Sequence, residues 1–171
     1  MKNTKGQIDW EAVYHDQMPR IYNFFRYRVT DDALAEDLTA VTFEKAWKSR
    51  HRFRDDLSAF STWLFVIARN TAADHFRRKH VEVTLDDNIP FGDQSRPVED
   101  RIQQDDELAQ LAVLMAQLSA RERELLALKY GAGLTNRAIA EITDINESNV
   151  GTILYRVIHR LRATWGITAN E

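Results

Sequence analysis

The C-terminal third of the chain, from Leu118 to Trp165, carries a pattern that few folds can accommodate. Its apolar periodicity and turn residues predict a helix, a glycine-containing loop, a short helix, a tight turn and a long last helix. One apolar stripe follows the last helix at helical spacing, through Val150, Leu154, Val157 and Leu161. The opposite side is polar. This layout predicts a helix-turn-helix, in which one face of the last helix packs on a scaffold and the other can enter a DNA major groove.

Composition limits the remaining choices. The chain has 171 residues, enough for one domain or two small ones, and only 6 Gly and 3 Pro. With helical periodicity throughout, we predict an all-α protein. The absence of Cys excludes disulfides, zinc–thiolate sites and thiol catalysis. No apolar run is long enough to span a membrane and the N-terminus lacks a signal-peptide core, so we expect a cytoplasmic protein without membrane insertion.

Charge is informative only by segment, because the formal net charge of −3 excludes a globally basic nucleic-acid binder. Residues 45–80 hold nine Lys or Arg against three Asp, and residues 82–107 hold nine Asp or Glu against two Arg. This order suggests a nucleic-acid surface followed by a linker. The acidic stretch has Pro90, Gly92 and Pro97 and no apolar period, so we expect a flexible linker over residues 81–105. This linker is either a solvated loop or a strand-like mimic of DNA that keeps DNA off the protein.

The first 80 residues form a separate helical unit in this interpretation. Asp9 can cap a first helix, which Pro19 interrupts or kinks. Asp31 or Asp32 starts a second helix. A polar, basic loop over residues 49–61 then precedes a third helix at residues 62–79. The expected core face of the third helix consists of Leu64, Ile67, Ala68, Thr71 and Ala72.

A second stripe of the third helix differs in character from this core face. Its members are Trp63, Asn70, Asp74 and Arg77. An aromatic, an amide and a cation on one line suit stacking on unpaired bases and recognition of their edges. Cations that could hold the nucleic-acid backbone by phosphate contacts flank this line, namely Arg52, Arg54, Arg78 and Lys79. The alternative is that Trp63 is a core residue and that the cations are a solvated helix end.

Three segments in combination resemble a bacterial sigma factor of the extracytoplasmic-function (ECF) type. They are Ala35–Trp47, Phe60–Lys79 and Leu118–Arg162, and their order and spacing also match that family. The resemblance implies two small helical domains joined by the acidic linker. Residues 1–80 would correspond to sigma region 2, and residues 106–171 to sigma region 4 with its helix-turn-helix.

The resemblance also implies what region 2 contacts. The helix over residues 32–48 looks like the docking surface for the largest subunit of core RNA polymerase. Residues expected at this contact are Asp37, Leu38, Val41, Phe43, Glu44 and Trp47. The basic loop and the third helix, with the residues named above, look like the part that captures the melted minus-ten element. The family commonly has Gln-Glu where this chain has Ala40 and Val41.

The last helix, from Glu147 to about Arg162 with Asn146 as N-cap, looks like the reader of the minus-thirty-five duplex. Expected DNA contacts are Ser148, Asn149, Thr152, Tyr155, Arg156, His159, Arg160 and Arg162. Arg156 is best placed for a bidentate guanine contact, unless it pairs with Glu141 instead. Gly151 and Ile153 stand where the family usually has cations, so we expect weak binding to isolated DNA.

The expected function is to direct core RNA polymerase to specific promoters and to initiate transcription by recognising and melting them. Expected partners are core RNA polymerase and promoter DNA, and the resemblance leaves an anti-sigma factor open. We expect no enzymatic activity, cofactor or metal, because motifs for acyl, phosphoryl and metal chemistry are absent. The acids at positions 31, 32, 36 and 37 could be imagined as a metal site with His51, but they are ordinary partners of a helix start. Two alternatives remain: a stand-alone helix-turn-helix regulator that binds duplex without polymerase, and a polymerase-binding modulator without promoter activity.

Overall fold

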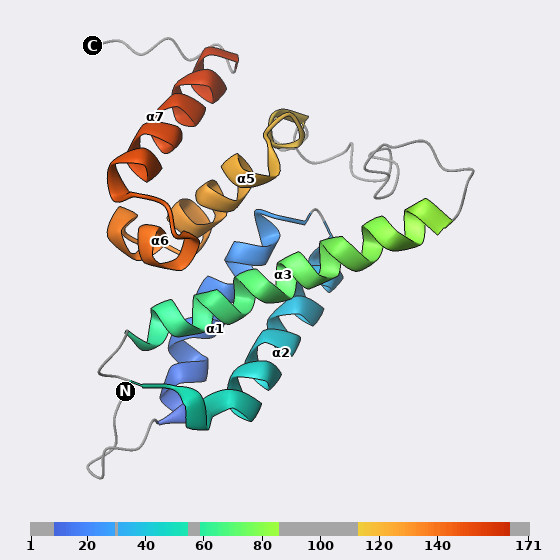
Figure 1. Ribbon diagram of the computed structural model, residues 1–171, viewed down its shortest axis with the longest axis vertical. Coiled ribbons are helices and arrows are strands. Elements are labelled where there is room, and N and C mark those ends of the chain that lie inside the picture. The colour runs from blue at the N-terminus through green and yellow to red at the C-terminus, as the bar shows by residue number, and fades with distance from the viewer. Residues whose placement is uncertain (1–8, 30, 55–58, 86–112, 165–171) are drawn as a thin grey trace.

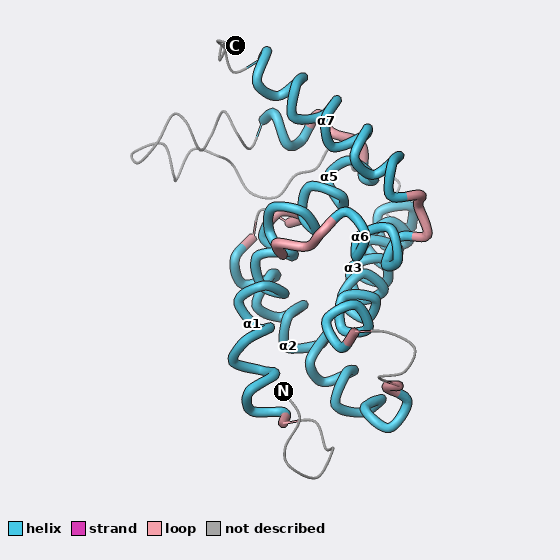
Figure 2. The backbone as a smooth tube through the Cα atoms, turned by 90° about the vertical axis from the view of Figure 1, so that its left-hand side faces the viewer, coloured by secondary structure: helices cyan, strands magenta, loops and turns pink. Residues whose placement is uncertain are grey.

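The computed structural model describes residues 9–29, 31–54, 59–85 and 113–164. The helices are α1 (Trp10–Arg26), α2 (Asp32–Ser49), α3 (Phe60–Leu85), α5 (Ala120–Leu126), α6 (Asn136–Thr143) and α7 (Glu147–Thr164). A 3-10 turn, η1 (Arg50–Arg52), follows α2, and a π-helical segment, η3 (Ala127–Gly131), continues α5. No strand occurs among the described residues, and the predicted all-α class is confirmed (Figures 1 and 2).

The starts of the first two helices are where the capping residues predicted them. The Asp9 carboxylate accepts a hydrogen bond from the backbone N–H of Ala12 at 3.1 Å, and the Asp31 carboxylate accepts one from Leu34 at 3.0 Å. Each cap satisfies an N–H that the first helical turn leaves without a backbone partner. The sequence therefore located both helix starts correctly.

Pro19, which is expected from the sequence to interrupt or kink the first helix, does not interrupt it. α1 continues through Pro19 without a break, although the proline ring removes one helical hydrogen bond. Buried side chains lie along the helix on both sides of it: Val13, Gln17, Ile21, Phe24 and Phe25. Burial of this face stabilises the helix on both sides of the proline, because each fully buried apolar side chain contributes about 1.5–3 kcal/mol.

The third helix is longer than predicted. α3 extends to Leu85, five residues into the stretch assigned to the linker. The rest of that stretch, residues 86–105, lies outside the described residues. The structure therefore does not test whether the linker is flexible. Within α3 the expected core face is largely as predicted, because Leu64, Ala68, Thr71 and Ala72 are buried and Ile67 is half-buried.

The C-terminal unit has the predicted helix-turn-helix. α5 starts with a capping box, in which Ser119 and Glu122 exchange hydrogen bonds. α6 ends at Thr143 and is followed by its C-cap Asp144, which adopts the left-handed conformation (φ 57°, ψ 35°) that Asp tolerates better than most residues. Asn146 then accepts a hydrogen bond from the Ser148 N–H at 2.9 Å and caps α7. These contacts set the turn between α6 and α7.

The two helical units pack directly against each other. The π-helical segment η3 lies against α1, and α6 lies against α3, so that one continuous apolar cluster includes buried residues of both units (Figures 1 and 2). Gly131 lies close to α1, because a Cβ atom there would be 2.9 Å from the carbonyl oxygen of Asn23. Nothing in the periodicity of the sequence predicted this contact.

Candidate polymerase and nucleic-acid interfaces

The predicted recognition helix, α7, separates an apolar face from a polar one. Val150, Leu154 and Val157 are buried against α5 and α6. Every residue predicted to contact the upstream duplex is exposed on the other face: Ser148, Asn149, Thr152, Tyr155, Arg156, His159, Arg160 and Arg162. Tyr155 is the most prominent of the apolar side chains there, at 71% exposure. The polar face can therefore meet a groove without any movement of the helices within the unit.

The arginines of α7 differ in their surroundings. Arg160 Nη2 lies 2.8 Å from Glu122 Oε1, so Arg160 connects α7 to its scaffold helix α5. Glu141, the alternative partner for Arg156, instead pairs with Arg137 at 3.6 Å. Among the described residues no ion pair involves Arg156, and its side chain is exposed. Arg156 is thus available to a ligand, whereas Arg160 would have to leave Glu122.

Glu122 is held by more than this ion pair. The backbone N–H of Ser119 donates to Glu122 Oε2 at 2.9 Å, and this bond is the main reason that the pKa of Glu122 lies below its ordinary value. The bond from Arg160 lowers the pKa of Glu122 further, while burial opposes both. The charged form of Glu122 is therefore favoured in the folded unit.

Trp63 combines the two interpretations that its spacing allowed. Its ring lies 5.4 Å from both the Phe53 and Phe60 rings, and it is half-buried. Phe60 also contacts Trp10 at 5.7 Å, which extends the aromatic cluster to the start of α1. Such edge and tilted contacts add stability beyond burial alone. Trp63 therefore supports the fold at the start of α3 and still exposes part of its ring.

Asp74 lies between two cations on the same side of the unit. Its Oδ2 is 3.3 Å from Lys45 Nζ on α2, and its Oδ1 is 2.9 Å from Arg77 Nη2 one turn further along α3. The hydrogen bond from Lys45 is the main reason that the pKa of Asp74 lies below its ordinary value. Lys45 also donates to Thr71 Oγ1 at 3.2 Å. The sequence indicated no role for Lys45, because a contact across 29 positions leaves no periodic signal.

The other residues predicted to contact the melted DNA strand lie at the surface. Asn70, Arg77, Arg78 and Lys79 are exposed on α3, and Arg52 and Arg54 are exposed at and just beyond η1. Residues 55–58 of the basic loop lie outside the described residues. The structure thus brings cations from η1 and α3 to the unit that also holds Trp63 and Asn70.

The α2 helix presents a partly apolar outer face. Asp37, Val41, Glu44 and Trp47 are exposed, with Trp47 at 50%, whereas Leu38 and Phe43 are buried. The Arg50 guanidinium stacks over the Trp47 ring at 4.2 Å and donates to the Trp47 carbonyl oxygen at 2.7 Å. Tyr14, half exposed, lies 4.9 Å from the Phe43 ring. Tyr14 and Arg50 extend this face beyond the residues that the sequence indicated.

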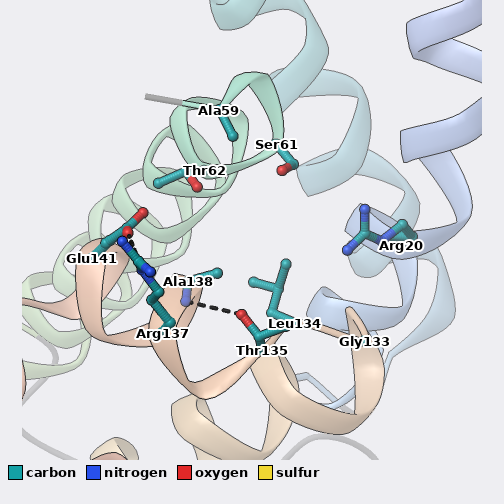
Figure 3. Close-up of a pocket in the computed structure, with 10 residues that line it drawn as sticks. All are labelled: Arg20, Ala59, Ser61, Thr62, Gly133, Leu134, Thr135, Arg137, Ala138 and Glu141. Atoms are coloured by element: carbon teal, nitrogen blue, oxygen red, sulfur yellow. Dashed lines mark hydrogen bonds and ion pairs between the residues drawn. The ribbon is translucent and has the colours of Figure 1, made fainter. Parts of the chain in front are cut away.

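A shallow pocket of about 320 Å³ lies where the two units meet (Figure 3). Arg20 of α1, Ser61 and Thr62 of α3, and Arg137 and Glu141 of α6 contribute polar side chains to its lining. Arg20 Nε donates to the Ala132 carbonyl oxygen at 2.9 Å and so connects α1 to the loop after η3. The contact between the units is therefore partly polar as well as apolar.

Two negative findings concern only the described residues. No group of three or more His, Asp or Glu side chains there is arranged to hold a metal ion. None of the described helices is long and apolar enough to cross a bilayer.

Comparisons with family models and with known proteins point to the same family. The Sigma-70 region 2 model matches residues 13–81, and the Sigma-70, region 4 model matches residues 108–161. The chain is 30% identical to the ECF RNA polymerase sigma factor SigM of Bacillus subtilis, over 94% of this chain and 98% of SigM. It is 31% identical to the ECF RNA polymerase sigma factor BldN of Streptomyces coelicolor, over 91% of this chain but only 60% of BldN.

Two solved structures share the fold. The sigma factor RpoE of Bartonella quintana, solved with the anti-sigma factor NepR, gives a TM-score of 0.74 at 23% identity, over 94% of this chain and 99% of that one. CnrH, solved with the cytosolic domain of CnrY, gives a TM-score of 0.64 at 20% identity, over 98% and 92%. With both region models matched and SigM aligned over nearly its whole length, this chain belongs to the ECF family of RNA polymerase sigma factors, which direct RNA polymerase to specific promoters to start transcription.

Proposed function

We propose that three exposed faces divide the work of initiation among them. The α2 face docks on core polymerase, α3 with η1 holds the opened minus-ten strand, and α7 reads the minus-thirty-five duplex. The observation that carries this division is that each expected set of contacts is largely exposed, on separate elements, while the apolar sides of the same helices form the core. In this scheme residues 1–80 act as region 2 and residues 106–171 as region 4, joined by residues 81–105.

Within the α2 face, the buried residues act through the exposed ones. Trp47 and Val41 supply the apolar contact, and Asp37 and Glu44 supply charge at its edge. Leu38 and Phe43 hold the helix in place from the core side. A large exposed aromatic such as Trp47 is the kind of residue that dominates binding energy at protein interfaces.

Promoter binding requires the two units to separate. The two elements lie about 25 base pairs apart, which is roughly 85 Å of duplex at about 3.4 Å per base pair. Packed helices lie only about 8–10 Å apart, and α6 packs directly on α3. The packed arrangement cannot span both elements, so it is the form that exists before the promoter is bound.

Transcription reconstituted with purified core polymerase tests the proposal. The chain should direct initiation at a subset of promoters with defined start sites, with strand opening detected by permanganate reactivity of unpaired thymines. The protein itself supplies no catalytic group in this scheme, acts in the cytoplasm with the polymerase, and needs no cofactor. Because the sigma factor RpoE of this fold was solved with the anti-sigma factor NepR, we include such a factor among the partners of this chain. Stoichiometric operator binding without polymerase, and no support of transcription, would contradict the proposal.

A further inference from the structure

Three charged side chains connect the two units at a largely buried position. Arg28, just beyond α1, places Nη1 2.7 Å from Glu124 Oε1 on α5. Arg69 on α3 places Nε 3.2 Å from the same oxygen. The Arg28 and Glu124 side chains are only 10% and 13% exposed, and that of Arg69 is 38% exposed. Two arginines of region 2 thus share one carboxylate oxygen of region 4.

The triad carries an excess of positive charge. One carboxylate faces two guanidinium groups, and Arg123 is close enough to act on Arg28 as a third. Burial is the main cause that lowers the pKa of Arg28, and Glu124 opposes this effect. The Arg28 guanidinium is also held over the Phe24 and Phe76 rings, at 5.6 and 5.3 Å. If Glu124 leaves with region 4, the two region 2 arginines remain in place without an acidic partner from this triad.

The chemistry and location of these arginines point to one replacement for Glu124. Guanidinium groups bind phosphate oxygens in the same way as carboxylate oxygens, with parallel N–H donors. Arg69 immediately precedes Asn70 on α3, the helix that carries the proposed strand contacts. Arg69 is 38% exposed, so this member of the triad can be reached from the surface of α3.

We propose that Arg28 and Arg69 form a second phosphate site for the opened promoter strand, and that Glu124 occupies this site while the two units are packed together. The inference rests on the proposed role of α3 in binding the strand. Because a phosphate and Glu124 compete for the same guanidinium groups, strand binding and separation of the units favour each other. Such coupling is reciprocal, so any change that releases Glu124 strengthens strand binding.

A charge-matched pair of variants of the full chain tests this competition. Glu124→Gln removes the carboxylate of the triad. Glu122→Gln removes the same charge from the same helix, but its partner Arg160 belongs to region 4. The probe is a fluorescent single-stranded oligonucleotide of random sequence. Glu124→Gln should bind it about fivefold tighter than Glu122→Gln. The logarithmic salt dependence should steepen by about 0.7 for each added phosphate contact, and adding Arg69→Ala should remove the gain.

Separation of the units is measured on the same variants. The chain has no native Cys, so Ala40→Cys on α2 and Ala163→Cys on α7, both exposed, accept a pair of dyes for energy transfer. Energy transfer between the dyes should be lower in Glu124→Gln than in the parent chain. In the parent chain it should fall when the oligonucleotide is added. If transfer falls in Glu124→Gln while its oligonucleotide affinity equals that of Glu122→Gln, the triad only holds the units together and the second phosphate site does not exist.

A steric variant covers the case in which Glu124→Gln fails to fold. Gly131→Ala leaves all charges in place but directs a Cβ to within 2.9 Å of the Asn23 carbonyl oxygen, across the contact between the units. It should also bind the oligonucleotide more tightly than the parent chain, and an unchanged affinity together with reduced transfer contradicts the inference. If neither the parent chain nor any variant binds the oligonucleotide, the proposed role of α3 in strand binding is wrong as well. If all bind it equally, only the second phosphate site is wrong.

Discussion

Arg160 of α7 lies 2.8 Å from Glu122 of α5, so a cation on the proposed DNA-reading face also fastens the recognition helix to its scaffold. Both partners are partly exposed, and such pairs contribute only about 0.2–1 kcal/mol. The pair therefore orients α7 more than it stabilises it. It also means that an effect of Arg160 on transcription has two possible origins, a contact with DNA and the ion pair with Glu122.

The first prediction concerns that pH dependence. The pKa of Glu122 is lowered in the folded unit, so the carboxylate stabilises the fold above its ordinary value of 4.5. This stabilisation is lost as the pH falls below 4.5 and the carboxylate becomes protonated. Thermal unfolding of Glu122→Gln should therefore depend less on pH between about 5 and 3 than that of the parent chain. Parallel curves for the two proteins would show that Glu122 contributes nothing.

The second prediction assigns base reading to Arg156. Its side chain is exposed and Glu141 is engaged by Arg137, so Arg156→Ala should cost about 1–3 kcal/mol at one base pair and relax preference there. Arg162→Ala, the control, should weaken binding to all minus-thirty-five sequences alike and reduce the salt dependence of binding by about one unit. Transcription from a set of minus-thirty-five variants measures both. If Arg156→Ala lowers activity uniformly instead, Arg156 contacts a phosphate.

The sequence predicted helix starts better than it predicted contacts between units. Caps such as Asp9, Asp31 and Asn146 act within a few residues, so their effect can be read locally. The bond from Arg28 to Glu124 spans 96 positions, and no periodicity records it. Hence the helix-turn-helix and the exposed face of α7 could be predicted, but the packing of region 4 on region 2 could not.

The same limit applies within region 2. The proline rule overestimated the effect of Pro19, because it counts a lost hydrogen bond and not the buried face that crosses it. Leu38 and Phe43, which the resemblance to the family places among the polymerase contacts, are buried in the core. Which face of an apolar helix is buried depends on the helices that pack against it, and the sequence of that helix alone does not specify them.

The third prediction concerns Trp63, which lies between Phe53 and Phe60. Trp63→Ala should lower both the melting temperature of the protein and promoter opening, because it removes packing and a base stack worth about 1–3 kcal/mol. Trp63→Phe keeps an aromatic ring and should recover most of the stability. If Trp63→Phe restores the melting temperature but permanganate reactivity stays low, the ring has a role in strand capture beyond the fold. Full opening by a folded Trp63→Ala protein would show that Trp63 has no such role.

The fourth prediction distinguishes two roles for Asp74. As an isolated acid it would repel phosphates, and Asp74→Asn would strengthen binding to a single-stranded oligonucleotide. The structure instead shows its carboxylate between Lys45 and Arg77, so we expect Asp74 to position both cations toward the strand. Asp74→Asn should then weaken binding, with a shallower salt dependence because fewer phosphate contacts form.

The control for this prediction is Asp16→Asn, which removes the same charge from an exposed side chain on a different helix, α1. It should leave the salt slope of oligonucleotide binding unchanged. Asp74→Glu should recover part of the loss, because a longer side chain can still reach one of the cations. Tighter binding by Asp74→Asn than by Asp16→Asn would show that repulsion outweighs positioning, and Lys45 would then have no part in holding the strand.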